Sequence, residues 1–166
     1  MTIVEPGPIT AHVIDSLAML TTGVCEELRT SGAGPLCWCG LHPGAVVSWE
    51  YCGQCSGDAC GMGYVRLAGV FPYSTFPVQI VDFQCTAPLA WVVEVGALRC
   101  MPMPSDGEIA SPDELALVTV EQVLDAQALY RALKCYGLEV AVESYTPVGP
   151  AGGCVGGFWR AYLALD

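Results

Sequence analysis

The sequence has few basic side chains and little charge of either sign. Six lysines and arginines stand against seventeen acidic residues, the formal net charge is −11, and charged residues make up only 14% of the chain. An acidic surface repels phosphate backbones, so we expect no sequence-specific binding to nucleic acid. A soluble monomer usually has about a quarter of its residues charged. The shortfall predicts that much of the surface lies against other protein.

Histidines and long apolar runs are also scarce. Only His12 and His42 are available, and they complete no Ser/His/Asp set and no HExxH motif, so we expect no enzymatic activity. The most apolar run, 88–98, is too short for a transmembrane helix and contains Glu94. The N-terminus has no basic region followed by an apolar core, which disfavours a signal peptide. We therefore expect a soluble protein made in the cytoplasm, with no membrane partner.

Hydrophobic periodicity predicts two helices. The first spans Ile9–Arg29, because apolar residues recur there every three or four positions. The second begins with a capping box formed by Ser111 and Glu114, and Gly137 is expected to end it. A second possible start at Thr119 allows a kink. The buried side of this second helix is predicted to comprise Leu117, Val120, Leu124, Ala128, Ala132 and Cys135.

Strands are predicted where apolar and polar residues alternate, because successive side chains point to opposite faces of a sheet. Residues 45–51 and 62–67 alternate in this way, and the turn-forming residues 52–61 lie between them. This arrangement predicts a long β-hairpin with a cysteine-rich loop. The segment 89–100 is apolar on both faces and is expected to be central in the sheet.

Three segments rich in proline or glycine are predicted to be irregular: 69–77, 101–107 and 145–157. A weak strand is predicted over 78–83, and a second hairpin from strands at 138–143 and 158–165. We therefore predict one domain, 1–166, of the α+β class: an antiparallel or mixed β-sheet with two α-helices packed on one face.

The cysteines just before the predicted hairpin and in its loop leave three states open. Cys37, Cys39, Cys52 and Cys55 could supply four thiolates to zinc, with Cys60 or His42 as a substitute ligand. The first pair does not have the two-residue spacing of a standard zinc ribbon. A disulfide such as Cys52–Cys60 is the rival interpretation, and free thiols are the third.

Two other interpretations of the cysteines follow from their surroundings. Thiol–disulfide catalysis at the CxxC motif that begins at Cys52 is disfavoured, because no helix fits the glycine-rich residues after it. Cys25, Cys100 and Cys135 lie in apolar periodic segments and are interpreted as buried small hydrophobic residues.

Two stretches carry a resemblance to a known family. One combines Pro43-Gly-Ala45, Trp49-Glu-Tyr-Cys52 and Val65-Arg-Leu67, and the other is the closing TPVGPAGGCVGGFW at 146–159. With one helix at the N-terminus and another before the last two strands, they resemble head-to-tail connection proteins of long-tailed (siphovirus-type) actinobacterial phages. Size and element order are most similar to tail terminators.

The resemblance implies a structural role in the virion neck. Tail terminators form a six-membered ring that caps the tail tube, stops its polymerisation and then receives the stopper of the filled head. The expected partners are other copies of the chain, the tube protein and the stopper, with assembly in the host cytoplasm. No catalytic residues and no cofactor carry over. A stopper or other connector ring protein is the nearest alternative, and a small zinc-binding or disulfide-stabilised adaptor domain is an alternative of another class.

The three irregular segments carry side chains that are typical of an interface. Aromatic residues and methionine are enriched in interface cores, and their exposure at this density would be a liability on a monomer. The residues predicted to contact neighbouring subunits, the tube or the stopper are Phe71, Tyr73, Phe76, Met101, Met103 and Tyr145.

Overall fold

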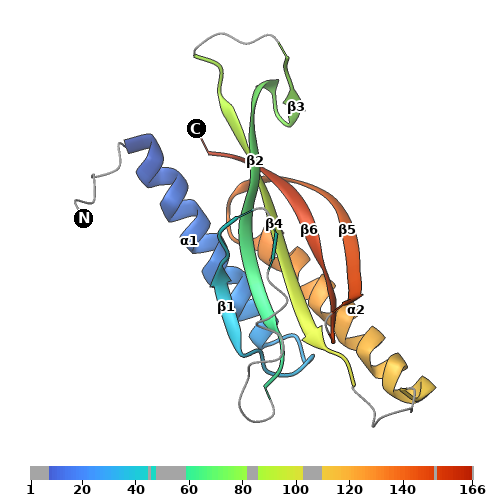
Figure 1. Cartoon of the computed structure of the whole chain (residues 1–166). Helices are drawn as coiled ribbons and strands as arrows, with labels where there is room; N and C mark the ends of the chain where they lie inside the picture. The colour runs from blue at the N-terminus through green and yellow to red at the C-terminus, as the bar shows by residue number, and fades with distance from the viewer. Residues whose placement is uncertain are drawn as a thin grey trace.

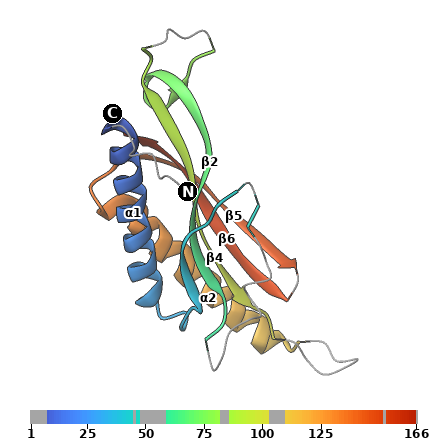
Figure 2. The same cartoon turned by 60° about the vertical axis from the view of Figure 1, so that its left-hand side comes forward.

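The computed structural model describes residues 8–44, 46–47, 59–81, 86–102, 110–151 and 153–165. Helices α1 (Pro8–Arg29) and α2 (Pro112–Cys135) lie on the same side of a six-stranded sheet (Figures 1 and 2). The predicted α+β class, the mixed sheet and the two helices are therefore confirmed.

The sheet has one parallel pair, and its other pairs are antiparallel. Its order is β1-β2-β4-β6-β5, with β3 pairing to β2 beside this path. β1 runs parallel to β2, and β4 is central as predicted, between β2 and β6. The strands are β1 (Trp38–Leu41), β2 (Met62–Thr75), β3 (Val78–Gln79), β4 (Leu89–Cys100), β5 (Glu139–Ala151) and β6 (Cys154–Ala164).

The main core lies between the helices and the sheet. The predicted stripe of α1 is confirmed, because four of its residues are almost fully buried: Val13, Leu20, Val24 and Leu28. They share one cluster with Leu129 and Leu133 of α2, and with Val93 and Val95 of β4. Burying one such side chain contributes about 1.5–3 kcal/mol, so this cluster holds both helices to the sheet.

The ends of α2 are as predicted. The Ser111 hydroxyl oxygen accepts from the Glu114 amide at 3.3 Å, and the Glu114 carboxylate accepts from the Ser111 amide at 2.8 Å. Gly137 has the expected positive φ of 75° just beyond the helix. The helix is continuous from 112 to 135, so Thr119 marks no restart.

The predicted buried side of α2 is wrong in its first half and at its end. Leu117, Val120 and Cys135 are exposed. The prediction failed because the buried face includes a charged residue, Asp125, which a search for apolar periodicity does not count. The buried face of the helix is therefore turned relative to the predicted one. The buried residues are Val118, Asp125, Ala128, Leu129, Ala132 and Leu133.

Two segments predicted to be irregular are strand. β2 continues through 69–75, and β5 and β6 take up most of 145–157. The glycines that suggested a loop instead permit close approach. A Cβ on Gly156 would collide with the carbonyl oxygen of Ala97 on β4, and one on Gly157 would collide with the Tyr145 ring. Composition alone does not separate such glycines from those of a turn.

The first predicted hairpin is only partly tested. Its second strand is the start of β2, whereas of the predicted strand 45–51 only residues 46–47 are described, and they lie in no strand. The neighbour of β2 on this side is the short β1, which pairs in parallel. β1 has only four residues and includes Cys39 and Gly40. It therefore lacks the alternation of apolar and polar residues that would have predicted a strand. Within the predicted segment 101–107, only Met101 and Pro102 are described.

Candidate assembly surfaces

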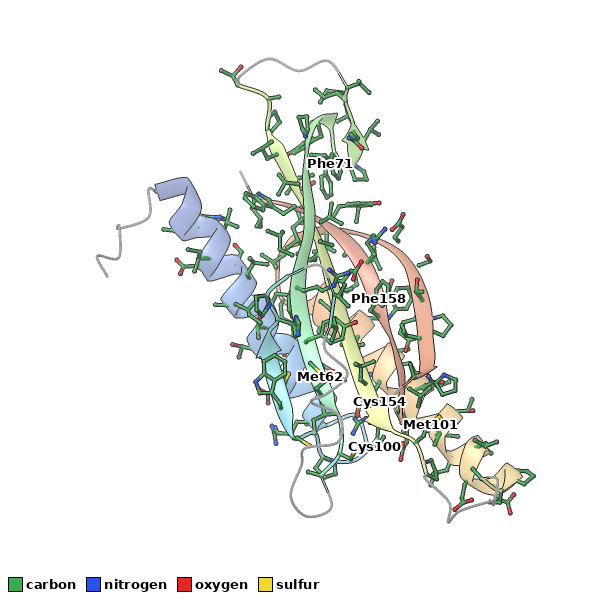
Figure 3. All side chains as sticks on the ribbon, in the orientation of Figure 1. Met62, Phe71, Cys100, Met101, Cys154 and Phe158 are labelled. Atoms are coloured by element: carbon green, nitrogen blue, oxygen red, sulfur yellow. A yellow bond between two sulfur atoms is a disulfide. The ribbon has the colours of Figure 1, made fainter. Side chains whose placement is uncertain are left out.

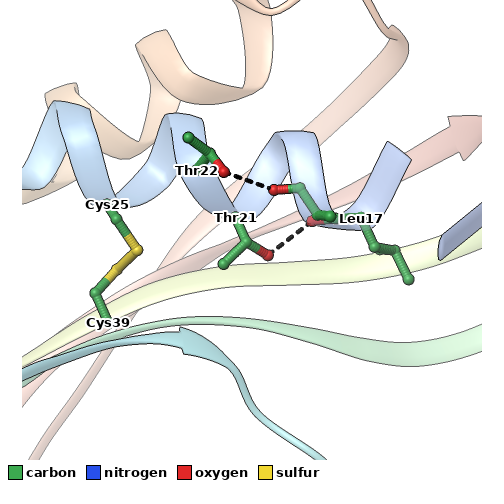
Figure 4. Close-up of a disulfide and its surroundings, with 6 residues drawn as sticks. Leu17, Thr21, Thr22, Cys25 and Cys39 are labelled. Atoms are coloured by element: carbon green, nitrogen blue, oxygen red, sulfur yellow. Dashed lines mark hydrogen bonds between the residues drawn. A yellow bond between two sulfur atoms is a disulfide. The ribbon is translucent and has the colours of Figure 1, made fainter. Parts of the chain in front are cut away.

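Disulfides hold the end of the sheet where β1 and β2 begin. Cys25 of α1 is bonded to Cys39 of β1, with the two Cα atoms 5.7 Å apart (Figure 4). Cys60, just before β2, is bonded to Cys100 at the end of β4. Cys37 also belongs to a disulfide. The sequence therefore correctly raised cross-linking as one possibility but missed which cysteines pair.

These bonds correct the cysteine assignments made from the sequence. Cys60 is bonded to Cys100 and therefore not to Cys52, which lies outside the described residues, as does Cys55. Cys37 and Cys39 are consumed in disulfides, so the four-cysteine zinc set is wrong. Within the described ranges, no group of three or more His, Cys, Asp or Glu is placed to hold a metal.

The interpretation of the remaining cysteines also changes. Cys25 and Cys100 are cross-linked rather than buried hydrophobic residues, and Cys135 is exposed. A cysteine within an apolar helical stripe looks the same in the sequence whether it is disulfide-bonded or free, because a bonding partner lies far along the chain.

A buried ion pair joins α2 to β4 and to the turn after α1. Arg99 donates from Nε and Nη2 to the two carboxylate oxygens of Asp125, each at 2.8 Å. Its Nη1 donates to the carbonyl oxygen of Gly34, also at 2.8 Å. The guanidinium and the carboxylate satisfy each other, which permits both to lie in the interior.

The opposite face of the sheet carries a second buried charge. Glu94 on β4 is buried, and its carboxylate pairs with Arg66 on β2 and with Arg160 on β6. The three residues are aligned across the sheet by strand register. In the sequence, the sign of these ion pairs was an acidic residue, Glu94, within an apolar strand.

The β2–β3–β4 arm, defined as residues 72–81 and 86–89, projects beyond the ends of β5 and β6 (Figure 1). The last β6 pairing is Ala90 with Ala164, whereas β2 and β4 pair further out at Pro72 and Leu89. The Ile80 amide donates to the Pro72 carbonyl oxygen at 3.0 Å. The arm is therefore made of the outer parts of β2 and β4, with the short β3 paired to β2, beyond the last pairing of β4 with β6.

The described part of this arm exposes apolar side chains beside uncharged polar ones such as Ser74, Thr75 and Gln79. Val78 is 61% exposed, and Val81 and Leu89 are also exposed. No charged residue occurs between Leu67 and Val81, in a chain whose net charge is −11. The arm thus differs from the rest of the acidic surface.

The α2–β5 groove is a second apolar surface. It has a volume of about 700 Å³, and its lining residues include Val123 and Tyr130 of α2, Tyr145 and Pro147 of β5, and Trp159 of β6. The Trp159 indole NH donates to the Ala126 carbonyl oxygen at 2.8 Å, which fixes the ring as the floor.

Tilted aromatic pairs line the groove. The Trp159 ring lies 5.4 Å from that of Tyr130 and 5.5 Å from that of Tyr145, measured between ring centroids. Burial, together with the nearby Asp125 carboxylate, raises the pKa of Tyr145 to about 12. Tyr145 is therefore a neutral phenol at neutral pH, and the groove floor bears no ionised group.

The outer edge of β5 is poorly suited to pairing with another strand. Pro147 and Pro150 each lack an amide donor, and register shifts interrupt the strand at 142–145 and 148–151. Such features are typical of edges that resist strand addition. The groove therefore offers side-chain contacts rather than a strand edge to a partner.

The predicted interface residues do not gather in one place. Tyr73 is buried against the Phe76 ring inside the arm, so it is not exposed as expected. Phe71 packs on Tyr162, and Met101 lies at the other end of the sheet, near Cys100 and Cys154 (Figure 3). Tyr145 lies in the groove, and Met103 is outside the described residues.

Other exposed residues of the arm and the groove were not singled out from the sequence. Val78, Val123 and Tyr130 belong to regular elements, where an apolar residue normally predicts core. Only their exposure in the folded chain marks them.

The comparisons with known proteins leave the family open. No protein-family model and no curated protein matches the sequence. Among the described residues, neither helix is long and apolar enough to cross a membrane.

Proposed function

We propose that this protein is a tail terminator of a long-tailed phage, a structural ring protein that caps the tail tube and joins it to the head connector. The proposal begins from the two sequence stretches that resemble this family. The observation that carries it furthest is the pair of separate apolar surfaces, the arm and the α2–β5 groove, on an otherwise acidic chain. Exposed apolar patches of this kind mark interaction sites.

A ring requires two different surfaces on each subunit. In a heterologous interface, one patch of a subunit meets another patch of its neighbour, and the series closes on itself if the rotation permits. The arm and the groove are two such patches. In the proposed ring of six, further contacts are made with the tube protein on one side and the stopper on the other. A stopper or another connector ring of the same neck also requires two different surfaces on each subunit.

A disulfide-stabilised adaptor domain is a candidate of another class. Cross-links between α1 and β1 and between Cys60 and Cys100 are features expected of a protein exposed to oxidising surroundings. A virion protein also meets such surroundings after lysis, so the disulfides do not distinguish the two. An adaptor, however, has no role in determining tail length.

The experiment is deletion of the gene from the phage that carries it, with complementation from a plasmid and electron microscopy of the lysate. We expect overlong tails and heads without tails in the deletion, and normal virions after complementation with the wild-type chain. Complementation by Val120→Asp, an exposed change on α2 at a residue that does not line the groove, is the matched control. Normal virions in the uncomplemented deletion would refute the proposed function.

A further inference from the structure

Three cysteines lie in one row across the end of the sheet where β2 begins. Met62 of β2 is paired with Leu98 of β4. Two residues further along, the same register places Cys60 opposite Cys100, and these two are bonded with their Cα atoms 5.8 Å apart. On its other side, Cys100 is paired with Cys154 of β6. Because β4 lies between β2 and β6, Cys100 is the middle member of the row.

The row lies on the face of the sheet that also carries Glu94. Side chains two residues apart on a strand share a face, so Cys100 is on the same face as Glu94 and Leu98. The buried side chains of Met62, Leu98 and Cys154 form one cluster, and Cys100 packs against it. Figure 3 labels Met62, Cys100 and Cys154 at this end of the sheet.

The ladder between β4 and β6 brings Cys100 and Cys154 close together. The Met101 amide donates to the Gly153 carbonyl oxygen at 2.8 Å. The next pair along, Cys100 and Cys154, is therefore of the kind whose Cα atoms are only about 4.5 Å apart and whose side chains approach most closely. This separation is within the range that a disulfide spans. Cys154 is buried and carries a thiol.

We propose that Cys154 exchanges with the Cys60–Cys100 disulfide and moves the cross-link from the β2 side of Cys100 to the β6 side. The Cys154 thiolate forms a bond to Sγ of Cys100, the Cys60–Cys100 bond breaks, and its electron pair leaves on Cys60. Cys60 gains the proton that Cys154 has lost, so no oxidant or reductant is consumed. Displacement at sulfur needs the incoming and leaving sulfur atoms on opposite sides of the attacked one, and the row of cysteines supplies this arrangement.

The two cross-links fasten different strands to β4. The Cys60–Cys100 bond holds the chain just before β2, whereas a Cys100–Cys154 bond holds the start of β6 and releases the Cys60 side chain. After release, the Cys60 amide still donates to the Pro35 carbonyl oxygen, at 3.4 Å. Cys60 and Cys100 are 40 residues apart, and Cys100 and Cys154 are separated by a similar length of chain. Loop closure in the unfolded chain therefore favours neither bond strongly. The exchange uses groups of one chain and does not depend on the proposed function.

The test is alkylation of the folded, full-length protein with iodoacetamide, followed by disulfide mapping by mass spectrometry. Digestion is carried out at low pH, where thiol–disulfide exchange is suppressed. Cys60 is half-buried, whereas Cys154 is only 1% exposed, so the reagent captures a displaced Cys60 thiol. We expect Cys60 to be labelled progressively while a Cys100–Cys154 bond accumulates. The exposed thiol of Cys135 is the internal reference for the reagent.

Cys154→Ala is the matched control, because it removes the attacking sulfur and keeps the Cys60–Cys100 bond. We expect Cys60 to stay unlabelled in this variant, with Cys135 labelled as in the wild type and thermal melting verifying the fold. The wild-type labelling rate should not depend on protein concentration, whereas attack by Cys135 of another copy would be faster at higher concentration. Labelling of Cys60 that persists in Cys154→Ala would overturn the proposal.

Cys60→Ser gives an independent result. It removes the leaving sulfur at a half-buried position, so the variant should fold. In a glutathione redox buffer, which supplies the oxidant for this variant, we expect a Cys100–Cys154 disulfide. With Cys154→Ala added, Cys100 should remain a thiol or a glutathione adduct. The proposal is wrong if Cys60→Ser forms no Cys100–Cys154 bond, and equally if Cys60 stays unlabelled in the folded wild type.

Discussion

Removal of the Asp125 carboxylate tests the energetic role of the buried ion pair directly. Arg99 and Asp125 are 4% and 2% exposed, so Asp125→Ala leaves a guanidinium in the interior whose remaining hydrogen bonds go to the carbonyl oxygens of Gly34, at 2.8 Å, and Pro35, at 3.5 Å. Breaking a buried pair on one side typically costs about 3–5 kcal/mol. For a chain of this size, each kcal/mol shifts Tm by about 2–4 °C, so we expect a fall of roughly 6–20 °C.

The assay is urea and thermal unfolding of wild type and variant, followed by circular dichroism. The matched control is Glu27→Ala. Glu27 lies on α1 and pairs with Arg131, which lies on α2 as Asp125 does. That pair is solvent-exposed, with the Arg131 side chain 47% accessible, and exposed pairs are worth only about 0–1 kcal/mol. A loss in Asp125→Ala no larger than that in Glu27→Ala would refute the reasoning, because it would show that the Arg99 guanidinium reaches water once Asp125 is removed.

A double substitution distinguishes the contribution of the ion pair from the cost of leaving one charge buried and unpaired. Replacing both residues by apolar side chains, Arg99→Met with Asp125→Leu, removes the unpaired charge, and such replacements are often neutral or stabilising. Arg99 also donates to the carbonyl oxygen of Gly34, which the double variant leaves without this donor. We therefore expect the double variant to be more stable than Asp125→Ala but less stable than wild type.

Two further predictions concern cross-linking and capping. Cys39→Ser should lower stability by about 3 kcal/mol, because it opens the 14-residue loop that Cys25 closes; thermal melting without reductant measures this, and an unchanged Tm would show that the bond is unimportant. At the start of α2, hydrogen bonds from Ser111 hold the pKa of Glu114 below its ordinary value, so its stabilising effect is complete above that ordinary pKa and is lost as pH falls through the lowered one. The stability difference between wild type and Glu114→Gln, measured by urea unfolding from pH 7 to pH 2, should disappear at the acid end, and a difference independent of pH would contradict this.

Local patterns in the sequence predicted the elements whose signals are local. The α1 stripe, the capping box at Ser111 and the long apolar β4 were each found at nearly their observed bounds. Hydrophobic periodicity, a helix cap and an apolar composition can each be recognised within one short segment. The disulfide partners could not be found in this way. Cys60 and Cys100 are 40 residues apart, and their proximity depends on the pairing of β2 with β4.

The candidate surfaces were predicted only in part, for a related reason. The segment 69–77, most of which becomes the outer half of β2, was singled out for its aromatic residues, but Tyr73 turns inward, and the exposed Val78 nearby belongs to β3. Which side of a strand faces outward depends on a bulge between Leu67 and Gly69. The groove combines α2 with a strand that follows it and a strand beyond that, so no single window of sequence contains it.

Stability and exposure are arranged at opposite ends of the sheet. The Cys25–Cys39 and Cys60–Cys100 disulfides fix the end where β1 and β2 begin, while the arm at the other end rests mainly on the pairing of β2 with β4 and on the small β3. An isolated two-stranded unit is marginally stable in water. The arm buries Tyr73 against Phe76 but leaves Val78 and Leu89 exposed, so a partner that covers these side chains stabilises the arm as it binds.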